Sequence, residues 1–306
     1  MSVRKANGDH YLIGSDGYVA EVTEVGASLR LLRYDERDLV TPFPDDAMRP
    51  VYRGTVLAPW PNRVADGRYI FDGATHQLPV NEVDRMNALH GLVAWSSWRL
   101  VEHTSEQVVL THRVHPRDGY PFLLDLQVSY RLGAEGLTWQ MMAVNSGHEP
   151  APYGCSHHPY LVAGHGGVDD WSLHLPAEQY LEVTPDRLLP VGVRSVQGTE
   201  LDFRTARRVG PTEVDHAFTG LARDADGSTQ ATLTDGSGSG VAMRWGAELP
   251  WVQVHTADRP EPELHRSGLA VEPMTCPPDA FNSGQDLVRL APGETHRASW
   301  TLSAIP

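Results

Sequence analysis

One glutamate stands inside a strongly apolar segment of the sequence. Glu272 lies in Leu269-Ala270-Val271-Glu272-Pro273, which has the composition of a buried strand. A carboxylate at the end of such a strand loses solvation, and this raises its pKa towards the range of a base that works near neutral pH. An outward-facing glutamate on an edge strand is an equally good interpretation of this segment taken alone.

Histidines occur in two further segments that are otherwise apolar or turn-forming. His90 lies in the segment 87–91 (NALHG), and a histidine before glycine is in general more often a surface or hydrogen-bonded residue than a catalytic one. His157 and His158 are adjacent in an extended segment. Their side chains must therefore point to opposite faces, so that at most one of them can face a given pocket.

An arginine and an aspartate complete the set of polar candidates. Arg63 follows Pro61 and Asn62, and taken alone it is better explained as a surface residue or an ion-pair partner. Asp215 lies in the short segment 214–218 (VDHAF). Both side chains have the hydrogen-bonding capacity to hold a polar ligand.

The elements that must position these residues are short and alternate with a period of two. The segments predicted as strands are Tyr18–Thr23, Arg68–Phe71, Gln107–Arg113, Leu124–Arg131, Gly136–Val144, Val241–Trp245, Trp251–Thr256 and Arg297–Ser303. Turn-forming clusters such as 71–73 (FDG) and 235–238 (DGSG) lie between them. Many short strands separated by turns predict an all-β sandwich or barrel. With no internal repeat and no low-complexity linker, we expect residues 1–306 to form a single domain.

Composition excludes several kinds of partner. The formal net charge is −14, and no run of Lys and Arg supplies the basic surface that nucleic acid or an anionic membrane needs. No stretch approaches 18 apolar residues, and the first residues contain no apolar run typical of a secretory signal. We therefore expect a cytoplasmic protein in which Cys155 and Cys276 are buried, reduced thiols.

Local signatures of other enzyme classes are missing. The sequence contains no G-x-x-x-x-G-K-[ST], no H-E-x-x-H, no C-x-x-C and no G-x-S-x-G, and no G-x-G-x-x-G joins a strand to a helix. Nucleotide hydrolysis, hydride transfer, zinc peptidase and serine esterase chemistry are disfavoured to that extent.

Taken together and in order, seven segments resemble the aldose 1-epimerase (galactose mutarotase) family. They are 57–72 (LAPWPNRVADGRYIFD), 87–91 (NALHG), 119–161 (ending APYGCSHHPYL), 214–218 (VDHAF), 251–256 (WVQVHT), 271–282 (VEPMTCPPDAFN) and 290–294 (LAPGE). The resemblance covers about residues 15 to 304. It implies a large antiparallel β-supersandwich of the galactose mutarotase type, in agreement with the period-two pattern. The chain departs from the family where HPYL replaces the more usual H-S-Y-F-N-L and where Trp60 and Pro61 replace smaller residues.

The resemblance also implies a role for each candidate residue. Glu272 matches the catalytic base and His158 the general acid. His90 matches a second active-site histidine that orients the sugar, and Arg63 and Asp215 match residues that hydrogen-bond sugar hydroxyls.

These residue types suit the opening and closing of a sugar hemiacetal. A base takes the proton of the C1 hydroxyl while an acid protonates the ring oxygen, and each positioned proton transfer contributes ~10²–10⁴-fold. The expected ligand is a small-molecule sugar, with no cofactor and no metal, and the protein is expected to be a monomer or a weak homodimer. Trp60, Tyr160 and Trp251 are candidates for an aromatic platform for the sugar, although such residues are more often part of the core.

Three alternatives remain at this stage. Two histidines and a carboxylate could form a metal site on a β-sandwich. A non-catalytic sugar-binding module would need Arg63 and Asp215 but not the proton-transfer pair. A hexose 6-phosphate could replace the free sugar, although the matched segments supply mainly Arg63 and Arg68 for its dianionic group.

Overall fold

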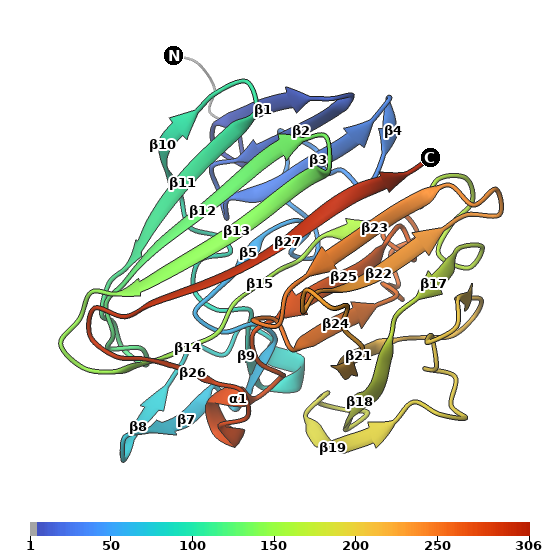
Figure 1. Ribbon diagram of the computed structural model, residues 1–306. Coiled ribbons are helices and arrows are strands. Elements are labelled where there is room, and N and C mark those ends of the chain that lie inside the picture. The colour runs from blue at the N-terminus through green and yellow to red at the C-terminus, as the bar shows by residue number, and fades with distance from the viewer. Residues whose placement is uncertain (1–4) are drawn as a thin grey trace.

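The segments with a period of two form strands at nearly the predicted bounds. In the computed structural model, which describes residues 5–306, β2 spans Tyr18–Thr23 and β7 spans Arg68–Phe71, as predicted. Strands β11 (Gln107–Val114), β12 (Leu124–Gly133) and β13 (Gly136–Asn145) extend the predicted segments by one or two residues. The prediction of a nearly all-β, antiparallel fold is confirmed (Figure 1).

The largest sheet has nine strands and curves across the molecule (Figure 1). Its order is β10 (Arg99–His103), β11, β12, β13, β27 (Thr295–Ile305), β23 (Gly240–Trp245), β22 (Thr229–Thr234), β17 (Ser172–His174) and β20 (Arg207–Arg208). Along β12 buried residues alternate with more exposed ones, because one face of this sheet packs inward.

A second sheet carries the segments that hold most of the candidate residues. Its order is β19 (Pro190–Ser195), β18 (Ala177–Val183), β21 (Asp215–Leu221), β24 (Trp251–His255), β25 (Leu269–Met274), β15 (Ser156–His157) and β5 (Val56–Leu57), and β16 (Tyr160–Leu161) also pairs with β25. Every residue of β25 is buried, which explains why its sequence is apolar apart from Glu272.

Aromatic side chains fill the space beneath β15. Trp139 of β13 and Trp300 of β27 stack with ring centroids 5.6 Å apart, and the ring of His157 lies 5.1 Å from Trp300. The hydroxyl of Tyr130 lies 3.0 Å from Nε2 of His157. His157 is therefore a core residue, packed where the two sheets meet.

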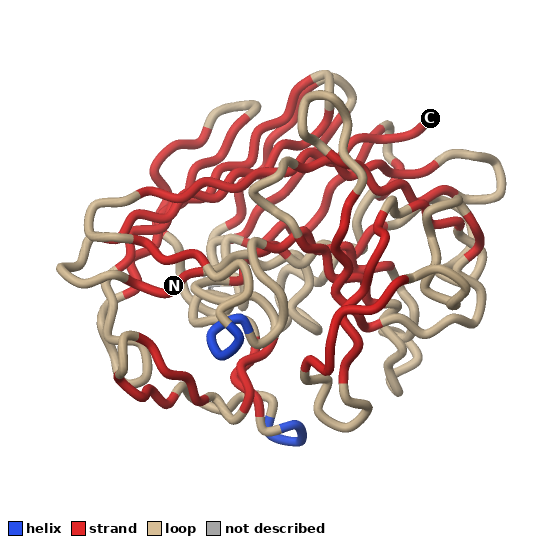
Figure 2. Tube along the Cα trace, turned by 60° about the horizontal axis from the view of Figure 1, so that its bottom comes forward, coloured by secondary structure: helices blue, strands red, loops and turns tan. Residues whose placement is uncertain are grey.

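Smaller elements complete the fold. The strands are β1 (His10–Ser15), β3 (Ser28–Tyr34) and β4 (Arg37–Asp38), which form a sheet with β2, and the pairs β6 (Arg63–Ala65) with β9 (Asn87–Leu89), β7 with β8 (Ala74–Gln77), and β14 (Ala151–Tyr153) with β26 (Val288–Leu290). The short helices η1 (Val83–Arg85) and α1 (Ala280–Ser283) lie among loops and strand ends, as Figure 2 shows.

In residues 5–306 no helix is long and apolar enough to cross a membrane. Cys155 and Cys276 are buried free thiols, as predicted.

Candidate active site

A pocket of about 560 Å³ lies where β21, β24 and β25 meet the β6–β9 pair. All five candidate residues, which come from five separate segments of the chain, line it: Arg63, His90, His158, Asp215 and Glu272. The fold therefore brings the whole predicted set to one place.

Glu272 and His158 face each other at the buried end of this pocket. Nε2 of His158 lies 3.4 Å from Oε1 of Glu272, and the two side chains are only 7% and 2% exposed. His158 follows directly after β15, so its ring points to the opposite face from that of the core residue His157. The ambiguity between the adjacent histidines is thus resolved, with His158 in the pocket and His157 in the core.

Burial moves the protonation equilibria of this pair in opposite directions. Desolvation raises the pKa of Glu272 well above its usual value, with a further contribution from the charge of Asp215, although Arg63 acts against it. Desolvation also lowers the pKa of His158 well below its usual value, and the neighbouring His90 adds to this. Burial therefore favours the state in which the pair holds one proton and that proton resides on Glu272.

Asn62 holds His90 through two hydrogen bonds, one to the His90 ring and one from the His90 backbone. The backbone N–H of Asn62 donates to Nδ1 of His90 at 3.2 Å, and the His90 N–H donates to the Asn62 carbonyl at 2.9 Å. Burial lowers the pKa of His90 to about 3, so the ring is neutral. Because Nδ1 accepts a hydrogen bond, the ring proton sits on Nε2, and His90 presents a donor.

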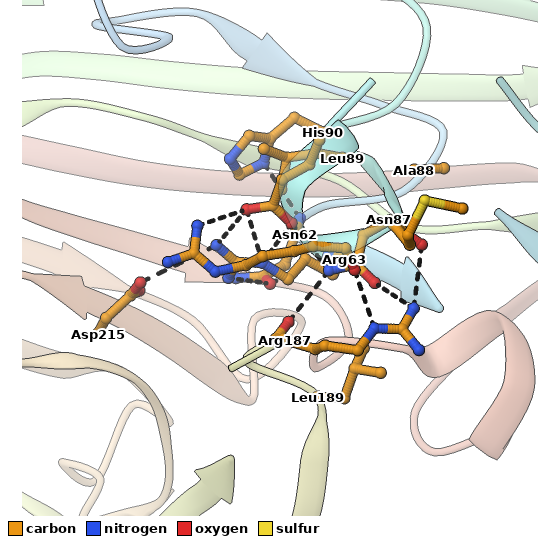
Figure 3. Close-up of polar contacts among 12 residues, drawn as sticks. Asn62, Arg63, Asn87, Ala88, Leu89, His90, Arg187, Leu189 and Asp215 are labelled. Atoms are coloured by element: carbon orange, nitrogen blue, oxygen red, sulfur yellow. Dashed lines mark hydrogen bonds and ion pairs between the residues drawn. The ribbon is translucent and has the colours of Figure 1, made fainter. Parts of the chain in front are cut away.

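Arg63 lies between two carboxylates. Its Nε and Nη2 both bond Glu82, each at 2.9 Å, and Nη2 lies 4.0 Å from Oδ2 of Asp215 (Figure 3). Asn87 also donates to Glu82 at 2.8 Å. The ion-pair interpretation of Arg63 is thus correct, and its partner Glu82, which precedes η1, also lines the pocket.

Asp215 is held ionised at the pocket wall. Its Oδ1 accepts a hydrogen bond from Nε2 of Gln253 at 2.7 Å and lies 3.9 Å from Nδ1 of His255. Burial tends to raise the pKa of Asp215, but His255, Arg63 and the Gln253 amide together outweigh it and lower the pKa below its usual value. The carboxylate can therefore accept hydrogen bonds from ligand hydroxyls.

Sequence reasoning missed Glu82, Gln253 and His255, all of which line the pocket. A signal existed for two of them. Gln253 and His255 are polar residues at alternate positions of a strand that is otherwise apolar, so both had to point to the same side. Within the described chain, Oε1 of Gln253 and both ring nitrogens of His255 are buried without a hydrogen-bond partner.

The three aromatic residues considered as a sugar platform do not line the pocket, in agreement with the alternative interpretation of them as core residues. Trp60, Tyr160 and Trp251 are each at most 2% exposed and belong to the core. Tyr160 instead supports His158, since the two rings stack with centroids 5.0 Å apart. The aromatic residue in the pocket wall is Tyr52, whose ring lies 4.7 Å from that of His90.

Metal ligation was one of the alternative interpretations. Across residues 5–306, no group of three or more His, Cys, Asp or Glu side chains is arranged to hold a metal ion. What the pocket does bring together is an acid–base pair, a neutral histidine donor, an arginine and an ionised aspartate. Such an arrangement can bind a polyhydroxylated molecule and move protons on it.

Comparisons with known proteins identify a family that this chain matches over nearly its whole length. The family model described as aldose 1-epimerase matches residues 9–303. The uncharacterized protein YihR of Escherichia coli (strain K12) is 38% identical over 292 residues, which cover 95% of this chain and 92% of that protein. Galactose mutarotase of Rattus norvegicus is 26% identical over 325 residues, covering 94% of this chain and 91% of its own length.

A solved structure shows the same fold. The GalM/aldose epimerase homologue from C. elegans superposes with a TM-score of 0.84 at 20% identity, over 97% of this chain and 99% of that one. The galactose mutarotase-like supersandwich expected from the sequence is thereby confirmed.

Proposed function

Because the chain belongs to the aldose 1-epimerase family, we propose that it is an isomerase that interconverts the α and β anomers of a free aldohexose. The observation that carries the proposal is the pair formed by His158 and Glu272, whose Nε2 and Oε1 atoms lie 3.4 Å apart in a polar pocket. A binding module would need the surrounding hydrogen-bonding residues but not this pair.

In the proposed reaction the pair exchanges protons with the sugar without any net gain or loss. The pair's one proton first passes from Glu272 to His158, across the 3.4 Å between Oε1 and Nε2. Ionised Glu272 then accepts the proton of the C1 hydroxyl while protonated His158 donates its proton to the ring oxygen, and the C1–ring oxygen bond breaks. After these transfers Glu272 is protonated and His158 has lost its proton, so both side chains are neutral, which is the state that burial favours. After rotation about C1–C2, the reverse transfers close the ring on the other face.

The other pocket residues hold the sugar during these transfers. His90 donates from Nε2, Arg63 donates from the part of its guanidinium that faces Asp215, and Asp215 accepts from hydroxyl groups. Holding the sugar in one orientation keeps both transfers aligned with the reacting atoms.

A free sugar fits the charges of the pocket better than a sugar phosphate. Three arginines line the pocket, but Arg63 and Arg85 both pair with Glu82. Among the described residues, Arg259 is the pocket arginine without an ion-pair partner. A phosphate dianion is usually bound by several uncommitted cations, so the free aldohexose is the preferred substrate.

Optical rotation tests the proposal directly. Freshly dissolved α-D-glucose and α-D-galactose should reach anomeric equilibrium faster with the protein than without it. The protein should accelerate the equilibration of α-D-glucose 6-phosphate by a smaller factor. Glu272→Gln and His158→Ala should lose the acceleration. If the wild-type protein leaves the approach to equilibrium of all these sugars unchanged, the proposed function is wrong.

A further inference from the structure

Aromatic side chains extend from the pocket to the protein surface. The ring of Tyr52 lies 4.7 Å from that of His90 inside the pocket and 5.6 Å from that of Trp95 outside it. The exposed fraction rises outward along this row, from 7% at His90 to 46% at Trp95. The row formed by His90, Tyr52 and Trp95 therefore leads from the reacting end of the site towards solvent.

Trp95 is held in place although it is exposed. The guanidinium carbon of Arg49 lies 4.4 Å from the centroid of the Trp95 ring, and Arg49 itself is fully buried. Arg49 bonds the carbonyls of Val25 and Ala94 and the hydroxyl of Ser28, and no carboxylate in residues 5–306 forms an ion pair with it. A buried cation without a counter-ion gains from an aromatic face, and this contact holds the indole in place while 46% of Trp95 remains exposed.

Tyr52 is fixed as well. Its hydroxyl accepts a hydrogen bond from Nδ2 of Asn81 at 3.3 Å, and Asn81 also lines the pocket. The backbone is left-handed at both Val51 (φ 43°) and Tyr52 (φ 56°), a conformation that is unfavourable for a β-branched valine. Strained backbone of this kind persists where the surroundings hold it, and it is common at ligand sites.

We propose that Tyr52 and Trp95 form a second subsite, which binds the next pyranose ring of a reducing disaccharide whose reducing-end sugar occupies the pocket. The inference rests on the proposed function, because anomer exchange requires a free C1 hydroxyl at Glu272 and His158. Any further sugar must then be attached to a carbon other than C1, and it extends away from that pair. The apolar faces of pyranose rings pack on aromatic rings, and such contacts favour a rigid, exposed indole.

The experiment compares a monosaccharide with disaccharides in four proteins. Anomer exchange of glucose, maltose and cellobiose is followed by polarimetry for the wild type, Trp95→Ala and Trp95→Phe. Leu12→Ala serves as control, since Leu12 is also exposed (60%) but lies on β1. Thermal unfolding of each variant checks that the fold is intact.

We expect Trp95→Ala to lower kcat/KM for at least one disaccharide by about three- to tenfold, because KM rises. The value of kcat/KM for glucose should change by less than twofold. Trp95→Phe should retain part of the effect, and Leu12→Ala should behave as wild type. An equal loss for glucose and disaccharide, an unchanged disaccharide rate, or a wild type that accepts glucose but no disaccharide would each overturn the subsite. A wild type inactive on every sugar would instead refute the proposed function.

Discussion

Nε2 of His158 lies 3.4 Å from Oε1 of Glu272, while Nδ1 of His158 and Oε2 of Glu272 have no hydrogen-bond partner within the described chain. The two groups are thus directed at each other, and no described protein group forms a hydrogen bond with their remaining polar atoms. A buried polar atom left unpaired costs about 1–3 kcal/mol. A sugar hydroxyl that reaches the carboxyl group of Glu272 would supply a partner for its Oε2 atom.

Removing either member of the pair should abolish most of the rate acceleration. We expect Glu272→Gln and His158→Asn each to lower kcat by ~10²–10⁴-fold, because each removes one positioned proton transfer. The double variant should lose little more than either single variant, since the two groups act as a unit. Polarimetry of glucose measures all three. Independent, multiplicative losses would show that the groups do not act together.

The pH dependence of kcat/KM should report the shared proton. Burial raises the pKa of Glu272 and lowers that of His158, and both shifts widen the pH range over which the pair holds one proton. We expect a plateau there, with activity falling in acid as the pair gains a second proton and in alkali as it loses its last. The two apparent pKa values belong to the pair and not to either residue. A rate that changes steadily through neutral pH would contradict this assignment.

Much of the fold and the site follows from local patterns in the sequence. The alternation in Leu124–Gly133 and the turn at Asp72 and Gly73 are local features, and both appear as predicted. The residues carried over from the family motifs also meet in one pocket. The alternation of side chains alone does not choose between His157 and His158, because the choice depends on which face of β15 meets the aromatic core, and it was the family resemblance that indicated His158. Glu82 was missed because its role comes from a contact with Arg63, 19 residues away.

Glu82 should act on the reaction through Arg63. Glu82→Gln removes one of the two charges that hold the guanidinium and leaves Asp215, 4.0 Å away, as its remaining carboxylate neighbour. We expect Arg63 to turn towards Asp215 and occupy the space of a sugar hydroxyl, raising KM by about tenfold with a smaller change in kcat. Asp84→Asn, a charge removal in the neighbouring η1 helix, is the control. Equal effects of both variants would assign the loss to net charge.

His157 should make stability depend on pH without taking part in catalysis. Burial lowers its pKa to about 3 in the folded protein, whereas an unfolded histidine titrates near 6.5. Between these values the unfolded chain binds more protons, so stability is present above pH 6.5 and is lost as the pH falls towards 3. Between pH 7 and pH 5 this residue should lower the free energy of unfolding by about 2 kcal/mol.

The measurement for this prediction is urea unfolding at both pH values. His157→Phe keeps a ring against Trp139 and Trp300 but cannot titrate, so its stability should fall less than that of wild type over the same interval. His148→Phe, at an exposed position, should leave the pH dependence unchanged. If His157→Phe loses as much stability between pH 7 and pH 5 as wild type does, the histidine is not the group responsible.

Gly91 should be required both for folding and for the position of His90. Its φ is 74°, and a Cβ added there would lie 2.1 Å from the carbonyl oxygen of Ala58. Gly73 has a similar φ of 80° but no atom within 4 Å of an added Cβ, which makes Gly73→Ala a matched control for backbone strain alone. That control should cost about 1–2 kcal/mol. Gly91→Ala should cost about 1–3 kcal/mol more, because packed backbone must shift.

The same shift should be visible in catalysis. His90 directly precedes Gly91, and its ring is held by the backbone N–H of Asn62 at 3.2 Å, so a displaced backbone moves the donor that orients the sugar. We expect Gly91→Ala to raise KM for glucose while Gly73→Ala leaves it unchanged. Urea unfolding and polarimetry of the two variants give both quantities. If Gly91→Ala and Gly73→Ala destabilise the protein equally, the backbone near Ala58 relaxes at no cost. The close approach of Gly91 to Ala58 would then not determine the position of His90.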